Sequence, residues 1–316
     1  LSGRLRGRSV MGYADATGKS VQVRAGTQIA GKEVEKIYAI SCSQSSMQLS
    51  TYINVFHETD RVSPVEVPYD GYLTYSGCRM VALNQEESPA DVTDEIQKTR
   101  NCPVPVLRCV TQWDFKDFTG HINLRRADSD AEGDRFRLYE LAGQAHNSFS
   151  GAFYRPGYAE IDQIQKTTDL PHTDITALPL EAFMRQALTN LDLWVREGIP
   201  APHAQGLIEV DENNIEVLDE NNNCKGGFRF PQLDVPVATY CSGTKKNDQD
   251  SCCVYFSEEK LKKLYPTRRD YIDKIFKAID VLEEQRFFSV EDADQMKLDI
   301  LKLPVPCRDH SSKFEE

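Results

Sequence analysis

The sequence contains no apolar run that approaches the roughly 20 residues a membrane-spanning helix requires. Its first ten residues, LSGRLRGRSV, are basic but have no apolar core, so they do not match a secretory signal peptide. No Met precedes them, and we expect the chain to be a cleaved precursor or a trimmed piece of a longer one. From the lack of a long apolar run we expect no membrane span.

No two cysteines have the C-x-x-C spacing typical of zinc or thioredoxin-like sites, and we expect neither a metal nor a cofactor. The nine cysteines include Cys224, Cys241, Cys252 and Cys253, which lie in a stretch rich in Gly, Asn and Asp. Cysteines in such loops are typical of disulfide bonds, and the odd total leaves one thiol unpaired or bonded to another chain. This usage predicts secretion or another oxidising compartment, although the chain has no N-x-[ST] sequon.

Basic residues are outnumbered by acidic ones, and the net charge is −12. Such a surface repels the phosphates of nucleic acids and of anionic membranes, so we expect neither as a partner. The hydrophobic fraction of 40% and the charged fraction of 27% are ordinary for a globular protein, which excludes the disordered and collagenous classes.

Four short runs rich in apolar and β-branched residues predict strands, at 34–40, 67–75, 104–111 and 136–142. The first and third are almost continuously apolar, as in strands that are covered on both faces. Residues 44–57 carry apolar side chains at helical spacing. Strands that alternate with helices predict an α/β fold with a mostly parallel sheet and helices on both faces.

The later part of the chain is helical and loop-rich. Helices are predicted at 179–197, 257–264 and 268–285, whereas 206–242 contains many turn residues and we find no internal repeat. We expect a single domain over residues 1–316, with its core at about 9–170 and a cap or C-terminal helical part at about 171–305.

A candidate nucleophile lies where the first predicted strand meets the helix. The segment Ser41-Cys42-Ser43-Gln44-Ser45 has the strand–turn–helix context of a nucleophile elbow, with serines in place of the two glycines of G-x-S-x-G. Ser43 would be the nucleophile, and the backbone N–H of Gln44 would donate to the oxyanion. The alternative is that Ser43 is only a helix N-cap.

Two further residues complete a possible triad. Asp114 follows the strand at 104–111, and His146 follows the strand at 136–142 in the turn AGQAH. The order nucleophile, acid, histidine is that of α/β-hydrolases. His146 would accept the Ser43 proton as general base, and Asp114 would hold the imidazole in the correct tautomer.

Several stretches resemble the alpha/beta-hydrolase domain proteins, a largely uncharacterised and mostly bacterial family. They are SCSQSSMQLSTYINVFHE, PYDGYLTYSG, VPVLRCVTQWD, RRADSD, FRLYELAGQAH, LTNLDLWVREGIPAP, CKGGFRFPQLDVPVATY and LKKLYPTRRDYIDKI. The resemblance covers nearly the whole chain from about Ser9 and implies an α/β-hydrolase fold with esterase-like serine chemistry. It places the nucleophile at Ser43 and the histidine at His146, and it implies a structural or site-shaping part for Gly226, Gly227 and Arg229.

The chain departs from the family pattern at three positions. Ser41 stands where the family has glycine, Gln112 where it has glutamate, and Asn147 where it has aspartate. The acid of the triad is therefore either Asp114 or a glutamate that this chain has lost at Gln112.

The resemblance also implies a long first half that carries the early strands and the second oxyanion donor. A sheet without those strands would expose an edge, so we expect the N-terminal half to exist as a separate associated chain. The basic start GRLRGRS is consistent with a processing site.

Two functions remain open. One is a serine hydrolase of carboxylic esters, with a small-molecule or lipid-like substrate. The other is a weak or inactive homologue with a binding, storage or structural role in a secreted, disulfide-linked assembly. It is favoured by the serines that replace the elbow glycines, and by Gln112 and Asn147 in place of acidic residues.

Overall fold

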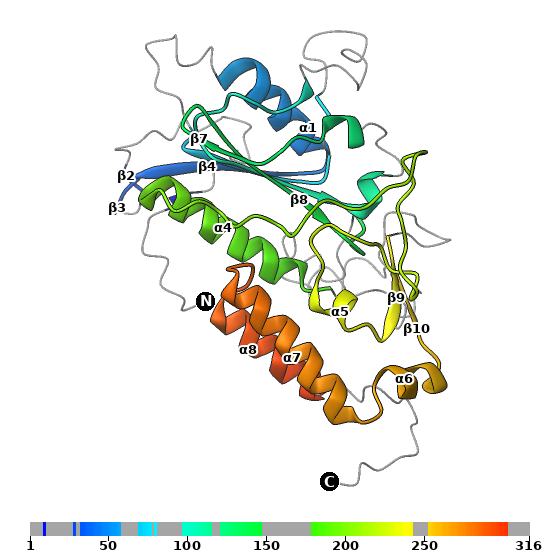
Figure 1. The fold of residues 1–316 in the computed structure, drawn as a ribbon. Helices are drawn as coiled ribbons and strands as arrows, with labels where there is room; N and C mark the ends of the chain where they lie inside the picture. The colour runs from blue at the N-terminus through cyan, green and yellow to red at the C-terminus, as the bar shows by residue number, and fades with distance from the viewer. Residues whose placement is uncertain are drawn as a thin grey trace, which may run out of the picture. The chain divides into compact units, whose positions relative to one another are not determined.

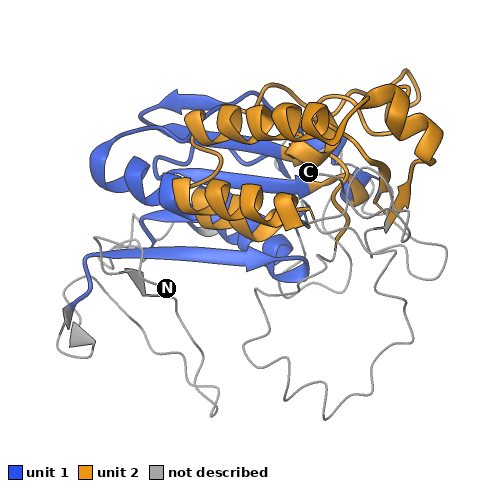
Figure 2. Cartoon of the chain, turned by 90° about the horizontal axis from the view of Figure 1, so that it is seen from below, with its two compact units in different colours: residues 1–110, 114–139, 187–203 blue, residues 111–113, 140–186, 204–316 orange. Residues whose placement is uncertain are grey.

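The computed structural model describes residues 9–10, 28–29, 32–57, 69–77, 79–80, 97–115, 121–146, 178–242 and 252–302. The chain divides into two compact units, shown in different colours in Figure 2. Unit 1 contains residues 1–110, 114–139 and 187–203, and unit 2 contains residues 111–113, 140–186 and 204–316.

Unit 1 is built around a six-stranded sheet in the order β1-β4-β5-β6-β8-β7 (Figure 1). Its strands are β1 Ser9–Val10, β4 Lys36–Cys42, β5 Gly71–Tyr75, β6 Val106–Thr111, β7 Ser129–Ala131 and β8 Asp134–Leu141, the last two residues of which belong to unit 2. The pairs β1–β4, β4–β5 and β5–β6 are parallel, and the edge pair β7–β8 is antiparallel. The predicted α/β fold with a mostly parallel sheet is confirmed.

Alternate residues of the strands face two different helices. On one face Tyr72 and Phe136 pack with Ile53, which follows α1 (Gln44–Thr51) in the π-helix η1 (Tyr52–Phe56). On the other face Leu191 of α4 (Leu180–Glu197) approaches Gly71. This two-sided burial explains why every residue of β5 and β6 is buried.

An arginine is buried in the face of unit 1 that α4 covers. Arg137 of β8 is fully buried, and its guanidinium lies 4.6 Å from the ring centroid of Trp194. It donates to the Ala201 carbonyl at 2.8 Å and to the Asp130 carboxylate at 2.6 Å. These contacts satisfy a charge that would otherwise be costly to bury.

Unit 2 contains a helical layer and two small strands. Its elements are α5 Pro231–Asp234, β9 Ala238–Cys241, β10 Cys252–Tyr255, α6 Glu258–Leu264, α7 Arg268–Glu284 and α8 Val290–Lys302. Strands β9 and β10 form an antiparallel pair, and α7 and α8 lie side by side (Figure 1). The core of this layer is apolar and includes Ile275, Ile279 and Ala293, each fully buried.

The helices of unit 2 begin at well-defined caps. The Ser257 hydroxyl accepts a hydrogen bond from the Lys260 N–H at the start of α6. Thr267 and Asp270 form a reciprocal capping box at the start of α7. The helices predicted at 179–197, 257–264 and 268–285 are confirmed within one residue at each end.

Residues 208–226 form two short hairpins that repeat after eight residues. Asp211 and Asp219 each begin a turn in which the carboxylate accepts two backbone N–H groups, and Asn214 and Asn222 have positive φ angles of 62° and 58°. Backbone hydrogen bonds of 2.9 Å join residues 209, 217 and 225 in a closed ring. The expectation of no internal repeat is wrong here, since DENN occurs at both turns.

The remaining elements are short. Strands β2 Gln28–Ile29 and β3 Lys32–Glu33 form an antiparallel pair, and 3-10 turns lie at Gln112–Phe115 and Ile122–Leu124. Among the described residues, none of the helices has both the length and the apolar character needed to cross a membrane. The predicted single domain with a boundary near residue 170 stays a prediction.

Candidate active site

Ser43 occupies a strained turn between β4 and α1. Its φ and ψ angles are 57° and −127°, a combination that residues with a side chain rarely adopt. It stands at the N-cap position of α1, but its side chain makes no capping hydrogen bond. The Ser43 hydroxyl therefore does not cap α1, which argues against the N-cap alternative. Backbone strain of this kind is found at functional turns.

Small side chains hold this turn together. The Ser43 N–H donates to the Tyr75 carbonyl at 2.9 Å, which ties the turn to the end of β5. The Ser46 hydroxyl donates to the same carbonyl and lies 3.0 Å from the Ser41 hydroxyl. Serine at position 41 therefore adds a bond inside the turn, which explains how it can replace the glycine of the usual pattern.

The start of α1 presents backbone N–H groups beside Ser43. Gln44 is the first residue of α1, where an α-helix leaves its N–H groups without intrahelical acceptors. The Gln44 side chain is exposed, and Ser43 is only partly exposed. The N–H of Gln44 is thus in the place that the nucleophile elbow uses for one oxyanion donor.

Asp114 lies in unit 1 next to the residues that follow β5. Its carboxylate is fully buried and accepts a hydrogen bond from the Ser76 hydroxyl at 2.7 Å and one from the Gly77 N–H at 3.3 Å. Gly77 in turn lies so close to the Ser43 carbonyl that a Cβ atom could not fit between them. A short path of contacts therefore connects Asp114 with the turn that carries Ser43.

Sequence reasoning missed Ser76 and Gly77. Both have positive φ angles, 53° and 74°, and both are buried directly after β5. The available signal was the Ser-Gly pair at the carboxyl end of a predicted parallel strand, where site residues of such sheets gather.

Gln112 has a structural contact of its own in unit 2. Its side-chain oxygen accepts a hydrogen bond from the Gly143 N–H at 2.8 Å. The bond joins the turn after β6 to the turn after β8, and a glutamate at this position could accept it equally well. The amide of Gln112 therefore preserves a link between two turns while removing a charge.

His146 lies in unit 2, five residues after β8. Its ring packs against Trp113 with the ring centroids 4.8 Å apart, and Trp113 directly precedes Asp114 in the chain. The imidazole is partly exposed. Ser43 and Asp114 belong to unit 1, so the assembly of His146 with them stays a prediction; Asn147 is outside the described residues.

Gly226 and Gly227 permit a close backbone approach in unit 2. Both have φ angles of 69°. A Cβ atom on Gly227 would lie 2.6 Å from the Glu140 carbonyl oxygen and 2.7 Å from Ile208 Cγ1. The adjacent Phe228 forms a parallel bridge with Leu141, so this segment is held against the end of β8.

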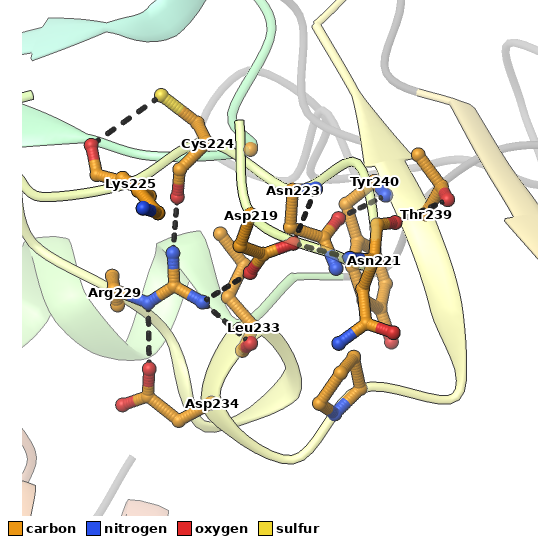
Figure 3. A network of polar contacts seen from close by, with 12 residues as sticks. Asp219, Asn221, Asn223, Cys224, Lys225, Arg229, Leu233, Asp234, Thr239 and Tyr240 are labelled. Carbon is orange, nitrogen blue, oxygen red and sulfur yellow. Dashed lines mark hydrogen bonds and ion pairs between the residues drawn. The ribbon is translucent and has the colours of Figure 1, made fainter. Parts of the chain in front are cut away.

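Arg229 is the centre of a polar network (Figure 3). Its guanidinium donates to the Asp234 carboxylate at 2.6 Å, to the Leu233 carbonyl at 2.7 Å, to the Cys224 carbonyl and to Asp219 at 3.4 Å. All these partners lie within residues 219–234, so Arg229 braces that loop. Its predicted effect on the active site, like that of the two glycines, stays a prediction.

The disulfide expected at Cys224 is not formed. Cys224 is a free thiol with 1% of its surface exposed, and burial raises its pKa to about 12. Its place in the second hairpin of residues 208–226, rather than in an open loop, explains why loop-like composition was misleading. The side chains of Cys241 and Cys252 are outside the described residues.

Other histidines of the described chain have structural partners. His57 Nδ1 lies 2.6 Å from the Tyr72 hydroxyl in the core of unit 1. His203 Nδ1 lies 2.7 Å from the Asp128 carboxylate at the surface. Within the described residues, no group of three His, Cys, Asp or Glu side chains could hold a metal ion.

A mostly parallel sheet flanked by helices, with a strained serine turn between a strand and the following helix, is typical of the α/β-hydrolase class. A family model described as an alpha/beta hydrolase domain matches residues 13–297. The chain therefore belongs to the alpha/beta hydrolase domain family, as the sequence motifs indicated. No curated protein and no solved structure matches it significantly.

Proposed function

We propose that this protein is a serine hydrolase of carboxylic esters, including lipid-like acyl esters, that works through an acyl-enzyme. The observation that carries the proposal is the backbone of Ser43. A φ angle of 57° at the strand-to-helix turn costs free energy, of order 1–3 kcal/mol for such a conformation. In a hydrolase this strained turn serves catalysis, because it presents the nucleophilic hydroxyl and an oxyanion-binding N–H side by side.

In the proposed reaction, His146 takes the proton of the Ser43 hydroxyl as its oxygen attacks the ester carbonyl. The Gln44 N–H stabilises the oxyanion of the tetrahedral intermediate. The intermediate collapses with transfer of the proton from His146 to the departing alcohol, which leaves an ester on Ser43. Water, deprotonated by His146, then releases the carboxylic acid and restores the hydroxyl.

Asp114 is the acid in this proposal. Its full burial and its bonds from Ser76 and Gly77 hold the carboxylate in one orientation. A fixed carboxylate can orient the imidazole and stabilise the imidazolium. Gln112 is uncharged and accepts from Gly143, so it cannot supply the negative charge.

A second candidate is an inactive homologue that binds or stores a ligand. Gln112 favours this candidate, because its neutral amide cannot supply the negative charge that a glutamate at this position would place beside the histidine turn. In this case the strain at Ser43 would be a remnant of an ancestral site.

Hydrolysis of p-nitrophenyl esters by the full chain distinguishes the two candidates. We expect Ser43→Ala and His146→Asn each to lower kcat by about a thousandfold or more, since members of a triad act as a unit. Ser45→Ala is the matched control, because Ser45 is an exposed serine two residues away in the first turn of α1. Absence of turnover by correctly folded protein, or equal activity of Ser43→Ala and Ser45→Ala, would favour the inactive homologue.

We also propose that a separate chain extends the sheet beside β4. Among the described residues, β1 pairs only with Lys36 and Ile37, so most of β4 has a partner on the β5 side alone. An open edge of this kind favours pairing with another strand. Intact mass and non-denaturing gels of native material would reveal an associated fragment; a single species without one would exclude it.

A further inference from the structure

Unit 2 contains a cleft of about 370 Å³ between the segment 227–235 and helix α7. We call it the α7 cleft. None of Ser43, Asp114 and His146 lines it. All of its lining residues belong to unit 2, so its shape is set within that unit alone.

One wall of the α7 cleft is apolar and rigid. Phe228, Leu282 and Phe287 line it and are each less than a tenth exposed. The rings of Phe228 and Phe287 pack with their centroids 4.8 Å apart, and Phe183 packs against both. This aromatic support fixes the wall without filling the cleft.

Two exposed lysines of α7, Lys274 and Lys277, also line the cleft. The Lys274 ammonium donates to the Leu264 carbonyl at 3.3 Å and lies 5.2 Å from the Tyr265 ring centroid. Within the described part of the chain, no carboxylate forms an ion pair with either lysine. Asp270 interacts electrostatically with Lys274 from the preceding turn of α7, but it does not line the cleft.

Neighbouring basic residues behave differently. Five other basic residues of α6, α7 and α8 are paired with carboxylates: Lys262 with Glu258, Lys263 with Glu259, Arg269 with Asp273, Lys297 with Asp280 and Lys302 with Asp299. Lys260 instead lies over the Phe256 ring, and Arg268 donates to the Leu301 carbonyl. Arg229 and Asp234 also line the cleft, where they form an ion pair with each other, and Arg229 also contacts Asp219. In a chain with net charge −12, the cleft thus combines an apolar wall with two lysines that form no ion pair among the described residues.

We propose that the α7 cleft binds a small amphipathic carboxylate, with its chain or ring against Phe228 and Phe287 and its carboxylate at Lys274 and Lys277. Apolar walls with a few convergent polar groups are typical of small-molecule sites. An ammonium pairs readily with a carboxylate as a point charge. The proposal does not depend on the hydrolase activity proposed above.

Octanoate is a suitable probe, with octan-1-ol and octylammonium as neutral and cationic comparators, measured by calorimetric titration against the full chain. We expect saturable binding of octanoate, weaker binding of octan-1-ol and none of octylammonium. Lys274→Gln/Lys277→Gln should weaken octanoate binding by about 3- to 30-fold, the range for two partly exposed ion pairs. The same variant should bind octan-1-ol as the wild type does.

Lys262→Gln/Lys263→Gln is the matched control, because it removes two positive charges from the neighbouring exposed face of α6. It should bind octanoate as the wild type does. Absence of saturable octanoate binding, or equal loss of binding in the two double variants, would overturn the proposal. Substitution of exposed lysines leaves the core intact, so a folding defect is not expected to obscure the result.

Discussion

Replacement of Gly227 by alanine tests the close approach that holds the Gly226–Phe228 segment against β8. The new Cβ atom would lie 2.6 Å from the Glu140 carbonyl oxygen, which is backbone and cannot rotate away. Alanine at a φ of 69° costs about 1–2 kcal/mol, and overpacking a close contact adds about 1–3 kcal/mol. We therefore expect Gly227→Ala to lower the free energy of unfolding by about 2–5 kcal/mol.

Gly198→Ala is a matched control for this prediction. Gly198 has the same φ angle of 69°, but a Cβ atom there would meet nothing within 4 Å. It should lose only the backbone contribution, about 1–2 kcal/mol. Urea denaturation followed by circular dichroism measures both. Equal losses in the two variants would refute the steric argument, since the contact with Glu140 distinguishes them.

Three further predictions concern the framework. Arg137→Met should lower the free energy of unfolding, measured in urea, by about 2–4 kcal/mol. The substitution removes the hydrogen bonds to Ala201 and Asp130 and leaves the Ala201 carbonyl unsatisfied. A loss below about 1 kcal/mol would contradict this reasoning. Thr267→Ala removes the capping box of α7 and should cost about 1 kcal/mol in the same assay, with no change meaning that the cap is not needed. Burial raises the Cys224 pKa from 9.0 to about 12, so the folded state holds this proton more tightly, and stability should fall as pH rises above 9. Urea midpoints between pH 8 and about 10.5 should fall less steeply in Cys224→Ala, and parallel curves would exclude the thiol as a cause.

The strands could be predicted because their burial is continuous. β5 and β6 are buried at every position, which requires the apolar runs seen in the sequence. Their bounds were less accurate: the strand predicted at 67–75 begins at Gly71, because the carboxylate of Asp70 turns back to accept the Ile37 N–H. Such a contact joins residues far apart in the chain and leaves no local pattern.

The positions of the candidate site residues could be predicted for a different reason, namely the order of the strands. Ser43, Asp114 and His146 follow the carboxyl ends of strands, where side chains of a parallel sheet meet, and that rule depends only on strand order. Ser76 and Gly77 also follow a strand, but strand order alone does not predict their contacts with Asp114 and with the Ser43 turn. Their role depends on an approach of two turns that only the folded sheet creates.

Two elements of unit 2 were missed despite local signals. Helix α8 begins after Ser289, whose hydroxyl accepts a hydrogen bond from the Asp292 N–H, but its many charged residues conceal the apolar face. The two hairpins carry the same DENN tetrapeptide at 211–214 and 219–222. An eight-residue period is too short to stand out beside the longer periods of common repeat proteins.

The most direct test of the proposed function is covalent labelling with a fluorophosphonate, followed by mass mapping of the modified peptide. The account predicts one stoichiometric adduct on Ser43, absent in Ser43→Ala and retained in Ser45→Ala. Labelling should slow strongly in His146→Asn, because the hydroxyl then lacks its base. Folded wild-type protein that takes up no label, or an adduct on any other serine, would contradict the account.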